Sequence, residues 1–212
     1  MSPFKFTLLS AIILSSSSIV QAQERSEPSF ALGISSYATA VIVDTPSGRD
    51  DWSFGGAAIN ATLAFNNNIA LRGHLYSQSE ADNENIEVSG YDIQALFGSN
   101  LTNEGLKYYL ALGLYSEELN VDIYRTGYRS YPYYPYYPYY TYYSYTENYS
   151  RSMTGLMLGF GLGYNWSRVA LDFTVSIRDA QPYADTFEEL NLYWSGGTVA
   201  AASGAFSLAY RF

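Results

Sequence analysis

The sequence has 212 residues, enough for one domain of ordinary size, and no cysteine, so no disulfide bond holds it together. Its 23 tyrosines, 17 glycines and 11 phenylalanines, with only 15% charged residues, favour strands over helices. A formal net charge of −9 argues against binding to nucleic acid, because contacts with phosphates need clustered lysine and arginine.

The first 22 residues have the pattern of a signal peptide. Lys5 supplies a positive start, residues 6–14 form a short apolar stretch, and residues 20–22 have the small-x-small pattern of a cleavage site. The apolar stretch is shorter than the roughly 20 residues that a membrane-spanning helix needs. We therefore predict an exported precursor with a signal peptide at 1–22 and a mature chain at 23–212.

Eight segments alternate between apolar and polar or small residues with a period of two, which indicates strands. The alternation is clearest at 152–166, where leucines and aromatic residues share one face and glycines occupy the other. The segments are close to the about 9–11 residues that cross a bilayer as a tilted strand. The predicted strands are 29–40, 52–65, 69–78, 87–98, 106–117, 152–166, 169–179 and 198–212.

The connections between these strands alternate in length. The short ones are 66–68, 99–105 and 167–168, and the long ones are 41–51, 79–86, 118–151 and 180–197. A soluble β-sandwich also has strands with this alternation, but it does not explain why short and long connections alternate along the chain. Turns on one rim and loops on the other are typical of membrane barrels. The predicted fold is all-β: an eight-stranded antiparallel transmembrane β-barrel with short periplasmic turns and long extracellular loops.

The last predicted strand ends in apolar residues at alternating positions: Phe206, Leu208, Tyr210 and Phe212. This ending resembles the C-terminal signature by which the outer-membrane assembly machinery recognises its clients, so these four residues are expected to be an assembly signal. Together with the leader and the strand number, it makes the chain resemble the OmpX/Ail-like and OmpA-barrel group of small, porin-family-like outer-membrane proteins. The resemblance covers nearly all of the mature chain, as architecture and not as a specific run of residues.

The resemblance implies a monomer in the outer membrane of a Gram-negative cell, in contact with lipid and lipopolysaccharide, with both termini in the periplasm. It does not fix a function, because one fold hosts many. We predict a barrel that anchors extracellular loops for surface interaction or adhesion, with an extracellular ligand as a further partner, and that contributes to envelope integrity.

Several charged side chains have the phase that turns them into the barrel. An eight-stranded lumen is just wide enough for side chains to fill it, and an unpaired buried charge is costly. We therefore predict a polar network in the lumen, made by Arg72, Asp92, Lys107, Asp172 and Arg178. The alternative is a narrow small-solute channel, because strands 152–166 and 198–212 turn glycine, alanine and serine inward.

His74 is the only histidine and raises a second alternative, an enzyme that modifies lipid A with a histidine, a serine and an acidic partner. Ser77 and Glu80 follow it, but the strand phase turns His74 into the lumen, away from lipid. We expect no catalytic residues and no cofactor. The acidic residues in the connections 79–86 and 180–197 match no calcium loop, so a solvated surface and no metal are expected.

The connection 118–151 holds a stretch rich in tyrosine and proline at 126–150. Prolines at intervals of three, each followed by two tyrosines, suit an extended polyproline-like segment without internal hydrogen bonds. Apolar residues at 119–123 alternate in the opposite phase to those at 106–114, so the strand either bulges or changes side above the membrane.

Tyrosine offers contact area, a hydroxyl and a low entropic cost of ordering, as binding surfaces require. We therefore hypothesise an extracellular recognition loop, with repeat expansion in an unconstrained loop as an equal alternative. The candidate contact residues are Tyr133, Tyr134, Tyr136, Tyr137, Tyr139 and Tyr140.

Overall fold

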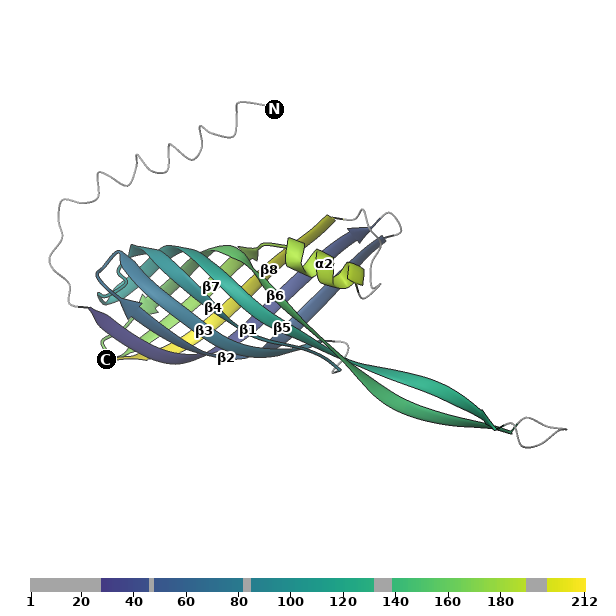
Figure 1. The fold of residues 1–212 in the computed structure, drawn as a ribbon. Coiled ribbons are helices and arrows are strands. Elements are labelled where there is room, and N and C mark those ends of the chain that lie inside the picture. The colour runs from purple at the N-terminus through teal and green to yellow at the C-terminus, as the bar shows by residue number, and fades with distance from the viewer. Residues whose placement is uncertain (1–27, 46–47, 82–84, 132–138, 190–197) are drawn as a thin grey trace, which may run out of the picture.

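The computed structural model describes residues 28–45, 48–81, 85–131, 139–189 and 198–212, so the predicted signal peptide lies outside the described residues. Eight antiparallel strands close into a barrel in which each strand pairs with its neighbours in sequence and β8 pairs with β1. The strands are β1 (Ser29–Thr45), β2 (Gly48–Ala64), β3 (Ile69–Glu80), β4 (Ile86–Ser99), β5 (Gly105–Tyr131), β6 (Tyr139–Asn165), β7 (Val169–Arg178) and β8 (Thr198–Arg211). The predicted fold class is confirmed (Figure 1).

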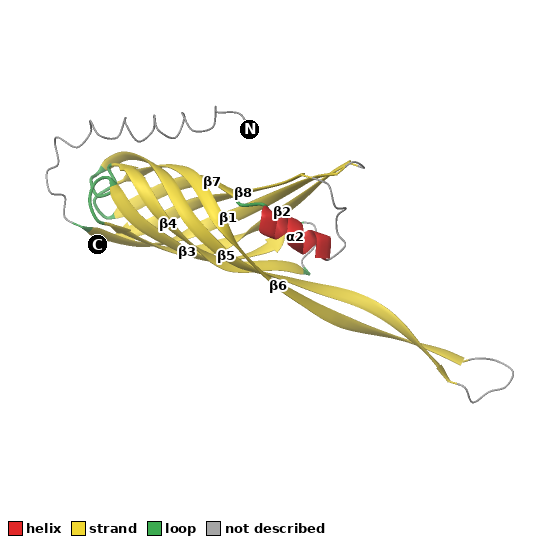
Figure 2. Ribbon diagram, turned by 45° about the horizontal axis from the view of Figure 1, so that its top comes forward, coloured by secondary structure: helices red, strands yellow, loops and turns green. Residues whose placement is uncertain are grey.

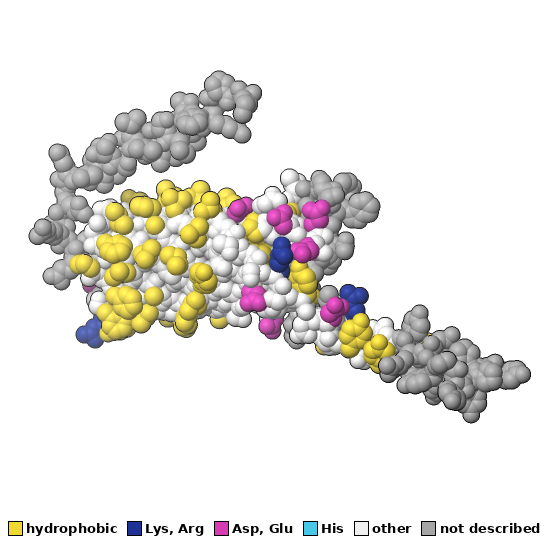
Figure 3. Space-filling view, viewed as in Figure 1, with side chains coloured by type: hydrophobic (Ala, Val, Ile, Leu, Met, Phe, Trp, Pro, Cys, Tyr) yellow, Lys and Arg dark blue, Asp and Glu magenta, His cyan; other side chains and the backbone are white. Residues whose placement is uncertain are grey.

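The outer face of the barrel carries a belt of apolar side chains, and the inner face carries small and polar ones. In β5, for example, Leu106, Leu110 and Leu114 are exposed on the outside, whereas Tyr109 and Lys107 are buried inside. Figure 3 shows the belt as yellow atoms over one end of the barrel, with charged side chains at its edges and beyond it. Exposed apolar residues in such numbers need an apolar solvent, which is the hydrocarbon of a membrane.

The end of the barrel that holds the C-terminus is here called the turn end (Figure 1). Exposed aromatic side chains, such as Phe30, Tyr210 and Phe212, gather at this end. Phe212 lies 5.8 Å from Phe30 and 5.0 Å from Tyr210, measured between ring centroids. Rings at this level suit the aromatic girdle at a membrane interface. The predicted assembly-signal residues are all exposed, three on the outer face of β8 and one directly after it: Phe206, Leu208, Tyr210 and Phe212.

Short turns connect the strands at the turn end. The Asn66 Oδ1 accepts hydrogen bonds from the amides of Asn68 and Ile69, at 2.8 and 2.9 Å, which fixes the turn between β2 and β3. Arg211 donates to the carbonyls of Trp166 and Thr102 and so ties two other turns to the end of β8.

At the opposite end, here called the loop end, the strands run farther than the sequence predicted. The segment 118–151, predicted as a loop, is mostly strand: β5 and β6 have 27 residues each and form one hairpin that projects from the barrel (Figure 1). The polyproline-like prediction for 126–150 was wrong for 126–131 and 139–150, which are strand, and 132–138 lies outside the described residues. The prediction failed because an alternation of tyrosine with threonine and serine also suits a paired strand.

The register of this hairpin is constant from Gly105↔Asn165 to Tyr131↔Tyr139, which rules out a bulge. Leu119 nevertheless points inward, whereas Leu114 points outward. The apolar residues therefore change side along one regular strand. The physical reason is that above the membrane no lipid covers an outward leucine, so an apolar side chain is stable there only inside the barrel.

The inward apolar residues of the loop end form the largest core cluster: Val41, Val43, Phe54, Ile86, Val88, Tyr115, Leu119, Met153, Met157, Tyr183 and Ala201. Tyr183 comes from a helix that the sequence did not predict, α2 (Gln181–Glu189), which lies at the loop end (Figure 2). Just before the helix, the Asp179 Oδ1 accepts a hydrogen bond from the amide of Gln181 at 3.1 Å, which caps the helix N-terminus. No helix among the described residues is long and apolar enough to cross a membrane.

Candidate functional site

All five residues predicted for the lumen network are buried inside the barrel: Arg72, Asp92, Lys107, Asp172 and Arg178. Their hydrogen bonds and ion pairs place them in two clusters at different heights, whereas the sequence analysis expected one network. We name them the inner cluster, around Asp172 near the turn end, and the outer cluster, around Arg178 near the loop end.

In the inner cluster one carboxylate lies between two cations. The Asp172 Oδ1 is 3.2 Å from Arg72 Nη2, and its Oδ2 is 2.7 Å from Lys107 Nζ. Arg72 also donates a 2.7 Å hydrogen bond to the Tyr109 hydroxyl, which lies 2.8 Å from the Thr174 hydroxyl. Asp172 is thus the counter-ion that keeps two buried cations compatible with a low-dielectric interior.

In the outer cluster Arg178 forms a fully buried ion pair with Glu117. The hydroxyls of Tyr76 and Tyr183 donate to the same carboxylate at 2.8 and 2.5 Å. The guanidinium carbon of Arg178 also lies 4.6 Å from the ring centroid of Tyr115, in a cation–π arrangement.

Asp92 joins this cluster through Tyr37. Arg178 Nη2 donates to the Tyr37 hydroxyl at 2.7 Å, and that hydroxyl donates to Asp92 Oδ2 at 2.7 Å. The other oxygen of Asp92 lies 2.9 Å from His74 Nδ1 and accepts from Gln94 at 2.8 Å. The outer cluster therefore reaches from the helix α2 to the middle of the lumen.

Sequence reasoning missed Glu117 and Tyr183 of the outer cluster, together with the tyrosines that contact Arg178 and Glu117 from the strands. Glu117 could have been found, because it continues the inward phase of Lys107 and Tyr109 at the end of the predicted strand. Tyr183 belongs to α2, and burial raises the pKa of its hydroxyl well above the ordinary value. It therefore stays protonated and remains a donor to Glu117.

Two of the inward glycines of β6, which suggested a conduit, are covered by tyrosine rings. A Cβ on Gly161 would lie 2.1 Å from the ring of Tyr109, and one on Gly155 would lie 2.7 Å from the hydroxyl of Tyr115. Each tyrosine stands directly opposite its glycine in the β5–β6 ladder. Two cavities along the lumen measure about 10 and 20 Å³, room for a single water each.

Gly161→Ala is expected to destabilise the barrel by about 1–3 kcal/mol, because the new methyl group forces Tyr109 away from Arg72. The matched control is Gly204→Ala, where the nearest atom to a new Cβ is the Thr174 carbonyl oxygen at 3.8 Å, and the expected change is within about 0.5 kcal/mol. Urea unfolding in detergent micelles measures both. Equal midpoints would show that the Tyr109 ring can move without cost.

The structure does not bring His74, Ser77 and Glu80 together. His74 and Glu80 face the lumen, but Ser77 is exposed on the outer face of the same strand. The catalytic alternative therefore has no assembled triad at these three residues. Among the described residues, no group of histidine, cysteine and acidic side chains could hold a metal ion.

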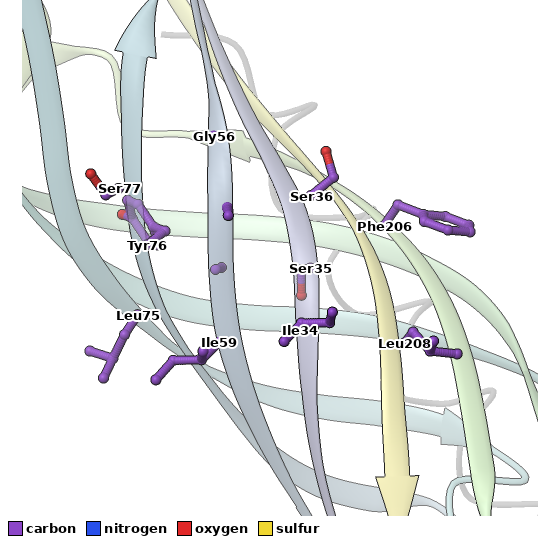
Figure 4. A pocket seen from close by; sticks show the side chains of 12 residues that line it. Ile34, Ser35, Ser36, Gly56, Ile59, Leu75, Tyr76, Ser77, Phe206 and Leu208 are labelled. Atoms are coloured by element: carbon purple, nitrogen blue, oxygen red, sulfur yellow. The ribbon is translucent and has the colours of Figure 1, made fainter.

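The outer face also has a hollow of about 840 Å³ where β1, β2 and β3 carry small residues beside Phe206 and Leu208 of β8. Figure 4 shows Ile34, Ile59 and Leu75 below it and Ser36 and Ser77 at its upper part. The change from large apolar side chains to Ser36 and Ser77 marks the upper limit of the apolar belt on β1 and β3. Lipid chains fill such a surface in a membrane.

Beyond the barrel, the projecting hairpin exposes many tyrosines. Tyr124 and Tyr142 are 70% and 75% exposed. Tyr143 stacks on Tyr145, with 5.9 Å between ring centroids, and covers Gly127 across the hairpin. Of the six predicted contact residues, Tyr139 and Tyr140 belong to β6, and Tyr133, Tyr134, Tyr136 and Tyr137 lie outside the described residues.

The closed ring of eight strands, the apolar belt and the filled polar lumen define the class: a transmembrane β-barrel of the type found in bacterial outer membranes. No protein-family model and no curated protein matches the chain. Among solved structures, Ail, the attachment invasion locus protein of Yersinia pestis, is similar with a TM-score of 0.51 at 18% identity, covering 88% of this chain and 99% of that chain.

Two other solved barrels are similar to a lesser degree. Neisserial surface protein A has a TM-score of 0.47 at 15% identity, covering 85% of this chain and 97% of that chain. The N-terminal barrel domain of Pseudomonas aeruginosa OprF has a TM-score of 0.43 at 11% identity, covering 86% and 97%. The likeness to Ail confirms the resemblance to small Ail-like barrels at the level of the fold.

Proposed function

We propose that this chain is an integral outer-membrane protein whose β5–β6 hairpin presents a tyrosine-rich surface to partners outside the cell. The observation that carries the proposal is the length of the hairpin. The last β4 partner of β5 is Ile86, opposite Val121, and β5 continues to Tyr131. At about 3.3 Å per residue, the hairpin reaches about 30 Å beyond its last neighbour in the barrel.

The chemistry of this hairpin suits recognition. A two-stranded ribbon is marginally stable in water, and aromatic pairs across its strands are one of the few ways to hold it together. Only some tyrosines of this hairpin make contacts across its strands, as Tyr143 does by covering Gly127. Tyr142 and Tyr124 are largely exposed to solvent. Exposed rigid aromatic side chains with hydroxyls are typical of binding surfaces.

The channel alternative finds less support. The lumen is crossed by the inner and outer clusters, two of its glycines are covered by tyrosine rings, and Tyr183 of α2 reaches into the loop end. Side chains tied by ion pairs and hydrogen bonds obstruct the passage of a solute.

The test is a shortened hairpin that leaves the barrel intact. Residues 126–144 are replaced by Asn-Gly, which joins the directly opposite residues Arg125 and Tyr145 by a two-residue turn. We expect cells that produce the parent protein to be retained on glass, polystyrene or immobilised lipopolysaccharide better than cells with the shortened protein, at equal amounts in the membrane fraction. Equal retention on all three surfaces would contradict the proposal.

A further inference from the structure

The projecting hairpin has two free edges. β4 accompanies β5 only to Val121, followed by one hydrogen bond from the Asp122 amide to the Asn85 carbonyl at 3.0 Å. β7 accompanies β6 only from Met157 onward. Among the described residues, the segments 123–131 and 139–150 therefore pair with each other alone, and each has one row of backbone groups without a neighbouring strand.

The register shows which residues form these rows. The Asp122 amide points to β4, and the Leu156 carbonyl points to the β7 side, where it accepts from Asp179 at 2.8 Å. Successive residues of a strand alternate in direction, and the β5–β6 register is regular throughout. The even-numbered residues of both strands thus turn their N–H and C=O groups to the free edges, among them Thr126 in β5 and Ser144 in β6.

The two edges differ in protection against pairing with another strand. Natural edge strands are usually blunted by charged residues, proline or bulges. The segment of β5 without a second neighbour, 123–131, contains Arg125 and Arg129, and Gly127 interrupts it. The segment 139–146 of β6, Tyr-Tyr-Thr-Tyr-Tyr-Ser-Tyr-Thr, contains no charge, no proline and no glycine. Uncharged segments of high β-propensity are the ones that pair between chains.

We propose that the free edge of β6 pairs with the same edge of a second copy of this chain in a facing membrane, so that the protein bridges two cells. The proposal rests on the proposed function, since it requires the hairpin to lie outside the cell. Copies in facing membranes run in opposite directions and pair antiparallel. Copies in one membrane run in the same direction and would pair parallel, which is slightly less stable per residue.

The distribution of charge also favours a second copy of this chain as the partner that pairs with the free edge of β6. When the uncharged segments 139–146 of two copies pair antiparallel, the first charged residue after the segment is Glu147. The Glu147 residues of the two copies then lie at opposite ends of the paired region. Directly opposed like charges, which destabilise a sheet, are thereby avoided. Glu147 is in addition held by Arg125 of its own hairpin, at 2.5 Å.

The experiment uses the full barrel in preformed phosphatidylcholine vesicles, with light scattering as the readout of clustering. Ser144→Pro removes an outward N–H from the β6 edge, and Thr126→Pro, on the directly opposite residue, removes one from the β5 edge. Neither change removes a hydrogen bond of the β5–β6 ladder. We expect the parent and Thr126→Pro to cluster vesicles. Ser144→Pro should weaken each contact by about fivefold per lost hydrogen bond, and the bond is lost on both copies.

Vesicles without protein, labelled in a second colour, are mixed into each sample and are expected to stay outside the clusters. Equal clustering by the two proline variants, recruitment of the protein-free vesicles, or no clustering by the parent would overturn self-pairing. None of these results touches the proposed function, which depends on retention of cells with the intact and shortened hairpins. If retention is lost with the shortened hairpin and vesicles never cluster, the hairpin binds other surfaces and not itself.

Discussion

Replacing Glu117 with glutamine is expected to destabilise the folded barrel by about 3–5 kcal/mol, the cost of leaving a buried charge without its partner. The Glu117 carboxylate is fully buried with Arg178 and accepts hydrogen bonds from Tyr76 and Tyr183. Glutamine keeps the shape and can still accept from one tyrosine, but the guanidinium of Arg178 loses its counter-ion. The loss of stability therefore measures the missing charge, because glutamine leaves no cavity.

Urea unfolding in detergent micelles measures this change, with Glu147→Gln as the matched control. Glu147 also forms an ion pair with an arginine, Arg125, but both side chains are about half exposed. An exposed pair contributes at most about 1 kcal/mol. If the two variants unfold at the same urea concentration, the outer cluster is hydrated and its ion pair does not stabilise the barrel.

Asp172→Asn is the second substitution with a large expected effect, because it leaves two buried cations, Arg72 and Lys107, without a counter-ion. The general cost of breaking a buried ion pair is about 3–5 kcal/mol. A cavity of about 20 Å³ adjoins Lys107 and Asp172, and a water in it would lower the cost. We therefore expect a loss of about 3 kcal/mol in the free energy of unfolding.

A double mutant separates charge from packing in the inner cluster. Adding Lys107→Met to Asp172→Asn removes one of the two uncompensated cations, so the double mutant is expected to be more stable than Asp172→Asn alone. Asp51→Asn, which removes the charge of an exposed partner of Arg49, serves as the surface control. A double mutant that is less stable than the single one would show that Lys107 stabilises the barrel by packing and not through Asp172.

The barrel could be predicted from the sequence because lipid and lumen impose opposite demands on alternate residues. In β5, Leu110 must face lipid and Tyr109 must face the lumen, and that alternation is visible without a structure. The inward phase of Arg72 and Asp172 followed from the same pattern. The turn at Asn66 was equally visible, because asparagine side chains close such turns.

The division of the lumen side chains into two clusters and the length of the hairpin could not be predicted, for two physical reasons. Alternation gives the side of the sheet but not the height in the lumen, which depends on strand register. Asp92 therefore bonds to Tyr37 and His74 in the outer cluster, apart from Asp172. Above the membrane, moreover, the lipid-facing signal ends, so the paired strands of 118–131 and 139–151 had the pattern of a loop.

The central claim is that the hairpin lies outside the cell and the turns face the periplasm. Chemical labelling tests this placement most directly. The chain has no cysteine, so Thr146→Cys in the hairpin and Glu104→Cys in a turn each create a single target, and both positions are exposed. A maleimide attached to a polymer too large to cross the outer membrane is added to intact cells. We predict labelling of Thr146→Cys in intact cells, and of Glu104→Cys only after the membrane is opened. Labelling of Glu104→Cys in intact cells, with Thr146→Cys protected, would contradict the account.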